Sequence, residues 1–192
     1  MAATDHSQQI KQDSQDYLIT ALLQLLKNQH LNEITVTKVV KKAGVSRMAF
    51  YRNFQTLEDI LVAYFKPKID QEFDIIINKT PQDKKMDALG NFFTDMAEPM
   101  KSAEIGNYEF IIQKIFDDNI KHFYDTVMNW DNFSDVQKKY WIKFMGAGTY
   151  AIWKEWLLTD QQESLHDIHT LIADFQIATL KALQNQTINK DI

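Results

Sequence analysis

Apolar residues recur at helical spacing over most of the chain. In the first such stretch they fall three and four positions apart, at Tyr17, Leu18, Ala21, Leu22, Leu25 and Leu26. This spacing is the stripe of an amphipathic helix, and the polar residues that follow predict an end near His30. No stretch alternates apolar and polar residues for long enough to indicate a β-strand. The pattern therefore predicts an all-α protein.

Two short helices are predicted next, separated by a tight turn at a glycine. Thr35 or Thr37 can cap the first helix, and glycine readily ends a helix in a left-handed conformation. Ser46 can cap the second helix, which places Phe50 and Phe54 together on its buried side. The result is a helix-turn-helix, a unit whose second helix can enter the major groove of DNA.

A further helix begins near Thr56 and meets a proline. Its apolar stripe would continue beyond residue 70 were it not for Pro67. Proline lacks the backbone N–H and crowds the preceding turn, so a kink or break is expected near Phe65–Pro67. We place a domain boundary there, with one domain at residues 1–66 and another at residues 67–192. Pro67 is interpreted either as a hinge or as a simple helix end.

The second domain is predicted to hold about five helices, which gives about nine in the whole chain. Residues typical of turns and caps separate these helices near residues 79–84, 98–104, 129–135 and 158–164.

Composition narrows the class of protein. The 192 residues are 45% hydrophobic, enough to bury a core, and include no cysteine. Disulfides, thiolate metal sites and cysteine nucleophiles are therefore excluded. Residues 1–17 contain no apolar stretch of signal-peptide type, and no apolar run approaches the roughly 20 residues that span a bilayer. We expect a cytoplasmic protein that does not enter a membrane.

Charge is distributed unevenly along the chain. The net charge is −5, yet residues 1–66 hold 8 Lys and Arg against 6 Asp and Glu. Between Ile34 and Leu57 no acidic residue occurs, and five residues are basic: Lys38, Lys41, Lys42, Arg47 and Arg52. One basic segment in an acidic chain is typical of a polyanion-binding module attached to a body with another task. The alternative is a solvated basic face on an ordinary helical hairpin.

The segment LNEITVTKVVKKAGVSRMAFYRNFQTLEDIL, residues 31–61, resembles the DNA-binding domain of the TetR family of bacterial transcriptional regulators. The resemblance covers about a quarter of the chain, residues 17–65, and rests on the order Ala43-Gly44-Val45-Ser46, Phe50-Tyr51, Phe54 and Glu58. It implies an N-terminal three-helix DNA-binding domain, joined by a connecting helix to a larger helical domain for ligand binding and dimerisation.

Three residues depart from the family pattern. Val40 stands where a small residue is usual, Met48 where Gly is frequent, and Leu57 where a Lys commonly touches phosphate. Met48 offers a flexible apolar contact to a thymine methyl group instead.

The resemblance also implies which residues meet DNA. Tyr51 would hydrogen-bond a phosphate through its hydroxyl, and Thr35 and Thr37 would cap a helix end against the DNA backbone. Arg47, Met48 and Ala49 would lie nearest the bases. The expected DNA-binding residues are Thr35, Thr37, Lys38, Ser46, Arg47, Met48, Ala49, Tyr51, Arg52 and Asn53.

Aromatic residues in the second domain can line an apolar ligand pocket or form an ordinary core. The residues expected at a pocket are Phe92, Phe93, Met96, Phe110, Phe116, Tyr124, Trp141 and Phe144. The small residues 146–148 allow close approach of a helix or a bound molecule. They lack the Lys-Ser/Thr pair and the preceding strand of a phosphate loop.

Near the C-terminus, apolar residues alternate in steps of three and four, which suits a seam between packed helices. The resemblance implies that the last two helices of each subunit form a four-helix dimer bundle, with a monomer core helix as the alternative. The residues expected at the dimer interface are Gly146, Tyr150, Leu165, Ile168, Ile172, Phe175 and Thr179.

No arrangement of residues predicts an enzyme, a metal site or a cofactor. No motif frames a nucleophile, and His166 with His169 lacks a third ligand of obvious spacing. We therefore predict a homodimeric transcriptional regulator that binds a near-palindromic operator in double-stranded DNA. It would be a repressor, released by a small-molecule effector.

Two alternatives stay open: a body that binds another protein or only dimerises, and activation in place of repression. An enclosed apolar cavity in the body would favour the ligand sensor, whereas a packed body would favour the interaction protein.

Overall fold

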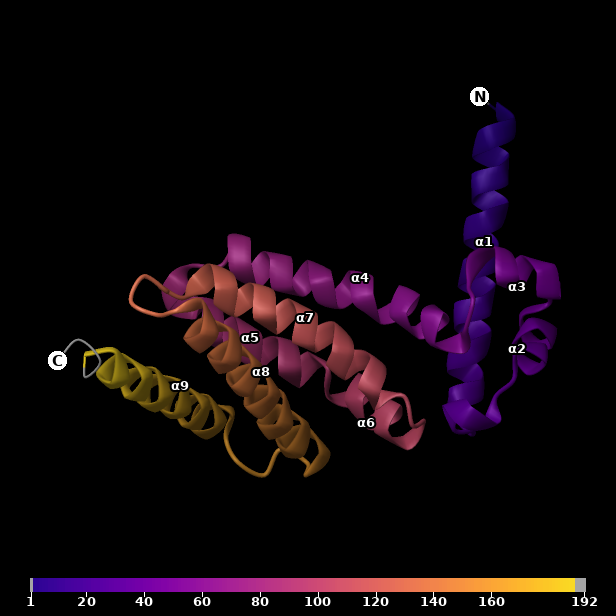
Figure 1. Cartoon of the computed structure of the whole chain (residues 1–192). Helices are drawn as coiled ribbons and strands as arrows, with labels where there is room; N and C mark the ends of the chain where they lie inside the picture. Colours follow the sequence, from indigo (N-terminus) through magenta and orange to yellow (C-terminus); the bar gives the residue numbers. More distant parts are fainter. Residues whose placement is uncertain (1, 189–192) are drawn as a thin grey trace. The chain divides into compact units, whose positions relative to one another are not determined.

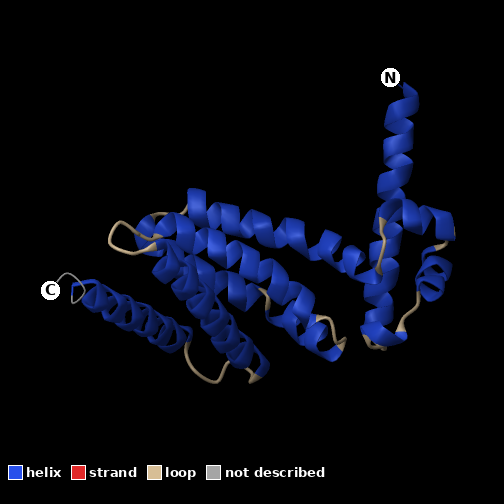
Figure 2. Cartoon of the chain, in the orientation of Figure 1, coloured by secondary structure: helices blue, strands red, loops and turns tan. Residues whose placement is uncertain are grey.

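A computed structural model of the chain describes the backbone of residues 2–188 and the side chains of residues 8–184. Every regular element within these residues is helical (Figure 2), which confirms the all-α class. The nine α-helices of this part of the chain (Figure 1) are α1 (Ala2–Leu26), α2 (Val36–Ala43), α3 (Arg47–Asn53), α4 (Leu57–Asn78), α5 (Lys85–Asp95), α6 (Ala97–Ile105), α7 (Glu109–Val127), α8 (Asp135–Leu158) and α9 (Leu165–Ile188). Two 3-10 turns, Leu31–Glu33 and Gln82–Lys84, lie between them.

The chain divides into two compact units. The first runs to Lys68 and also includes Ser102–Ile115, and the second holds Ile69–Lys101 and the described residues from Phe116 onward. The sequence prediction placed the boundary after residue 66 and did not assign Ser102–Ile115 to the first domain. Long-range contacts tie this segment to the first unit: the Leu31 N–H donates to the Gly106 carbonyl over 2.8 Å, and Tyr108 stacks on Phe65.

The core of the first unit is built from the apolar stripes predicted from the sequence. α1 packs against α2 and α3, and six side chains from these helices and α4 are completely buried: Leu18, Leu22, Val39, Phe50, Ile60 and Leu61. The apolar faces therefore meet as their spacing predicts.

Of the kink or break predicted near Phe65–Pro67, the break is wrong, because α4 continues through Pro67 to Asn78. Pro67 is therefore not a helix end. Buried side chains stand on either side of the proline, with Phe65 before it and Ile69 and Phe73 after it. Burial of one such side chain contributes about 1.5–3 kcal/mol, which offsets the roughly 3 kcal/mol that an interior proline costs a helix.

The predicted separator at residues 98–104 is also wrong, since it lies within α6. Pro99 is the third residue of α6, and the N–H groups of a first helical turn have no intrahelical partner to lose. The observed breaks fall on either side of α6, at Met96 and at residues 106–108.

Buried polar groups fix helices of the second unit to one another. Lys85 is buried, and its ammonium donates to the carbonyl oxygens of Ile76 and Ile77 at the end of α4. His169 of α9 lies against Gly90 of α5, where an added Cβ would stand 1.7 Å from the imidazole Nε2. A larger residue at position 90 would displace the His169 imidazole, so glycine suits the close approach of α5 and α9 at this point.

Candidate nucleic-acid interface

Two side-chain caps define the helix-turn-helix. The Thr35 Oγ1 accepts from the Lys38 N–H over 3.3 Å at the start of α2, and the Ser46 Oγ accepts from the Ala49 N–H over 3.0 Å at the start of α3. Between the two helices Gly44 has a φ of 68°, a left-handed conformation that suits glycine. Thr35, and not Thr37, caps α2, since Thr37 is the second residue of that helix.

α3 is anchored by one face and leaves the other free. Phe50 and Phe54 are buried, with ring centroids 6.3 Å apart. The Asn53 side chain is turned back along the helix, where its Nδ2 donates to the Ala49 carbonyl over 2.7 Å. Eight of the ten residues expected to bind DNA are exposed together on this unit: Thr35, Thr37, Lys38, Ser46, Arg47, Met48, Tyr51 and Arg52. The other two, Ala49 and Asn53, are half-buried.

The exposed face is cationic. Lys41 and Lys42 are exposed in the last turn of α2, and Arg47 and Arg52 are exposed on α3. The Lys38 ammonium donates to two neutral acceptors, the Gln29 Oε1 at 2.9 Å and the Glu33 carbonyl at 3.0 Å. Residues 34–57 contain five basic residues and no acidic one, so this segment carries a net positive charge.

Two of the departures from the TetR pattern are buried. Leu57 lies in the core of the first unit, so this position offers no phosphate contact, and Val40 is buried at the base of α2. The third departure, Met48, is exposed beside the basic residues.

The residues expected at a ligand pocket are mostly packed against other rings. Five are buried: Phe92, Phe93, Phe116, Tyr124 and Trp141. Phe93 stacks on Trp153 with a centroid distance of 4.7 Å and meets Phe116 at 5.2 Å, while Tyr124 meets Trp141 at 5.1 Å. Met96 is half-buried, and Phe110 and Phe144 are exposed. The buried members of this set belong to the core, and Phe110 and Phe144 lie at the surface. None of the eight residues lines either of the two hollows described for the second unit.

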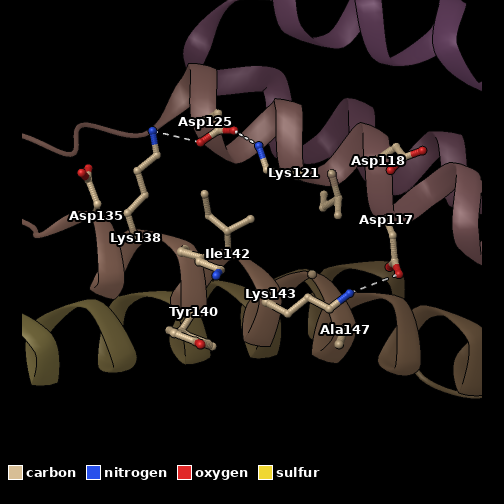
Figure 3. A pocket seen from close by; sticks show the side chains of 13 residues that line it. Asp117, Asp118, Lys121, Asp125, Asp135, Lys138, Tyr140, Ile142, Lys143 and Ala147 are labelled. Carbon is tan, nitrogen blue, oxygen red and sulfur yellow. Dashed lines mark hydrogen bonds and ion pairs between the residues drawn. The ribbon is translucent and has the colours of Figure 1, made fainter.

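The larger hollow is an open groove of about 510 Å³ between α7 and α8. Figure 3 shows Asp125 between Lys121 and Lys138, with ion pairs of 2.7 and 2.9 Å, and Lys143 opposite Asp117 at 3.7 Å. Burial acts to raise the pKa of Asp125, but its two lysine partners outweigh this effect and hold the pKa below its ordinary value. Spacing in the sequence does not reveal this groove, because its charged residues are spread over two helices.

The residues expected at a dimer interface divide into two groups. Gly146, Tyr150, Ile168 and Ile172 are buried within the chain itself, so these residues offer little surface to a partner. Thr179 is half-buried and accepts from the Trp141 Nε1 over 2.9 Å, and Leu165 is half-buried. Only Phe175 is well exposed, at 46%.

A different apolar stripe is exposed on the same two helices. On α8 it consists of Val136, Tyr140 and Phe144, four residues apart, and on α9 of Leu171 and Phe175. We name these five residues the outer stripe. Their i, i+4 spacing in the sequence could have revealed them, but the buried stripe beside them on each helix is equally apolar.

No helix in the described part of the chain is long and apolar enough to cross a membrane. Within the same residues no cluster of three or more His, Cys, Asp or Glu side chains is arranged to hold a metal ion.

Similarity to known proteins is found in the fold. No protein-family model and no curated protein matches the sequence at a significant level. Among solved structures, the chain is similar to a TetR transcriptional regulator from Streptococcus agalactiae 2603V, with 15% identity over 92% of this chain and 99% of that chain and a TM-score of 0.66.

Two further structures each match 88% of this chain with a TM-score of 0.52. The dihydroxyacetone kinase operon activator DhaS shares 19% identity and is covered over 97% of its length, and a TetR transcriptional regulator from Rhodococcus sp. RHA1 shares 15% and is covered over 96%. The chain therefore has the fold of the TetR-type transcriptional regulators, with the N-terminal helix-turn-helix at α2 and α3 followed by a helical C-terminal body.

Proposed function

We propose that the chain is a homodimeric transcriptional regulator that binds a near-palindromic operator through α2 and α3. The observation that carries this proposal is the capped helix-turn-helix, which presents exposed basic residues in a segment without an acidic side chain. Basic side chains on such a surface contact phosphates, and the exposed residues at the start of the second helix are those that reach base edges.

Dimerisation follows from the proposed symmetry of the operator and from the outer stripe. Two recognition helices must enter successive major grooves about 34–36 Å apart, which a monomer cannot do. Five large apolar side chains exposed on two adjacent helices are a surface that a second copy of the chain can cover. The interface therefore uses Phe175 together with residues of α8 that the sequence prediction did not include.

Repression relieved by a small-molecule effector is the proposed mode of regulation. The aromatic rings of the second unit are packed against one another, so the site proposed for an effector is the groove between α7 and α8. The volume of this groove, about 510 Å³, is within the usual range for ligand pockets. An effector there would act by its difference in affinity between the DNA-fitting and non-fitting states, typically about 1–3 kcal/mol.

A second candidate function is a regulator whose body binds another protein, or an activator. The close ring packing of Phe93, Phe116 and Trp153 favours a solid body over an enclosed sensor cavity. One of the similar structures is named an operon activator.

The test is selection of bound fragments from a random pool of double-stranded DNA, followed by titration of the selected sequence at several salt concentrations. A near-palindromic sequence bound by two copies of the chain is the expected result. Recovery of no sequence, or binding by a single copy, would contradict the proposal. A thermal-unfolding screen of small molecules then distinguishes regulation by a small-molecule effector from regulation by a protein partner. A ligand that binds only the native state raises the stability of that state.

A further inference from the structure

Met48 has the most exposed of the large apolar side chains in the described part of the chain. Its side chain is 81% accessible to solvent, although it stands among polar and basic residues. It is the second residue of α3, in the turn capped by Ser46. Its position is therefore at the N-terminal end of the helix that would enter the major groove.

The packing of α3 places Met48 on the exposed face of the helix. Phe50 and Phe54 hold the helix by its opposite face. On the exposed face the neighbours are Arg47 and Tyr51, with the guanidinium carbon 6.0 Å from the ring centroid. Those two side chains can donate hydrogen bonds to phosphates or bases, whereas a thioether is only a weak acceptor.

The chemistry of Met48 limits what it can recognise. Base edges in the major groove present hydrogen-bond donors and acceptors, and their one apolar group is the 5-methyl of thymine. A flexible, polarisable side chain is well suited to cover a methyl group. We propose that Met48 selects a thymine in each half-site of the operator by contact with its 5-methyl group, an inference that rests on the proposed DNA-binding function.

The experiment removes the methyl group without changing base pairing. Each thymine of the selected operator is replaced in turn by deoxyuridine, and binding of the full chain is titrated. At one thymine in each half-site the replacement should weaken wild-type binding about fourfold, the effect of losing one buried methyl-sized group.

Two variants of Met48 make the assignment specific. Met48→Gln has similar length without an apolar end and should bind thymine and deoxyuridine operators equally at that position. Met48→Leu keeps an apolar end and should retain the discrimination. Because the side chain is exposed, both variants should keep the wild-type thermal midpoint. Both should also keep the salt dependence of binding, since that slope reports phosphate contacts.

The outcomes separate this inference from the function on which it rests. If bound DNA is selected but no thymine is sensitive to methyl removal, the inference is overturned and the DNA-binding function stands. If Met48→Gln keeps the wild-type sensitivity, another residue contacts the methyl group and the inference is again overturned. If no DNA is selected, the function and the inference both fail.

Discussion

Arg52 tests the electrostatic part of DNA binding at the scale of one residue. It is exposed near the C-terminal end of α3, in a segment without acidic residues. Each basic contact to phosphate contributes about 0.9 to the slope of log affinity against log salt. Arg52→Glu should therefore weaken binding to all DNA sequences and reduce that slope, measured by titration between about 50 and 200 mM salt, over which binding that rests on several phosphate contacts falls by orders of magnitude.

Lys84→Glu is the matched control for Arg52, because it makes a similar reversal of charge at an exposed residue of the second unit. The DNA affinity and the salt slope of Lys84→Glu should stay close to those of the wild type, since Lys84 is not part of the helix-turn-helix. An unchanged slope for Arg52→Glu would remove Arg52 from the interface.

His169 makes the stability of the second unit depend on pH. Burial lowers the pKa of His169, the carboxylate of Asp87 at 3.6 Å partly opposes this, and His166 adds to the lowering. The folded pKa therefore lies below the unfolded value of about 6.5, so the unfolded chain binds more protons between these two values. The free energy of unfolding should fall as the pH drops below about 6.5.

Denaturant titrations from about pH 7.5 to 5 measure this dependence. His169→Gln removes the titrating group and should flatten the dependence in that window. The control is His122→Gln at an exposed position of α7, which should leave it unchanged. A steep dependence that survives in His169→Gln would assign it to other groups.

At the scale of helices, the outer stripe on α8 and α9 and the buried stripe beside it should respond differently to the same substitution. Phe144 is 66% exposed and Phe175 46%, whereas Ile172 is 1% exposed. Phe144→Glu combined with Phe175→Glu should give a folded, helical monomer, because the charges are solvated once the partner has left. Ile172→Glu should unfold the second unit, since it buries a charge without a partner.

Sedimentation and circular dichroism on each variant distinguish these results. Phe110→Glu changes an equally exposed aromatic residue of the first unit and should leave the dimer intact. A folded dimer in the Phe144, Phe175 double variant would move the interface away from the outer stripe.

At the scale of the whole molecule, Pro67 lies within α4, one residue before the end of the first unit's N-terminal segment at Lys68. Its exposed ring leaves the carbonyl of residue 63 without the usual helical donor. Pro67→Ala adds this donor and should raise the free energy of unfolding, by up to about 3 kcal/mol. Operator affinity should stay within a few-fold of the wild type.

Denaturant unfolding and operator titration together test the role of this proline. A large loss of operator affinity in Pro67→Ala would show that the proline sets the course of α4 that DNA binding needs. If an effector is found, operator affinity is measured with and without it for the wild type and for Pro67→Ala. The difference between the two affinity ratios gives the contribution of Pro67 to the coupling between effector binding and DNA binding.

The sequence alone determined the features that depend on residues close together in the chain. Helical periodicity, the Thr35 and Ser46 caps and the left-handed turn at Gly44 each involve contacts within about five residues. The basic character of residues 34–57 is also a local property. These features are enough to predict the all-α class and the helix-turn-helix, and the structure confirms both.

Only the tertiary structure decided which apolar face is covered and by what. α8 and α9 each carry two apolar stripes, and periodicity does not show that Ile172 is buried while Phe144 and Phe175 are exposed. Likewise, an aromatic sequence fits a pocket or a core equally, until Phe93 is seen stacked on Trp153. The physical reason is that burial is nondirectional and depends on partners distant in sequence, whereas helix formation and capping depend on neighbours in the chain.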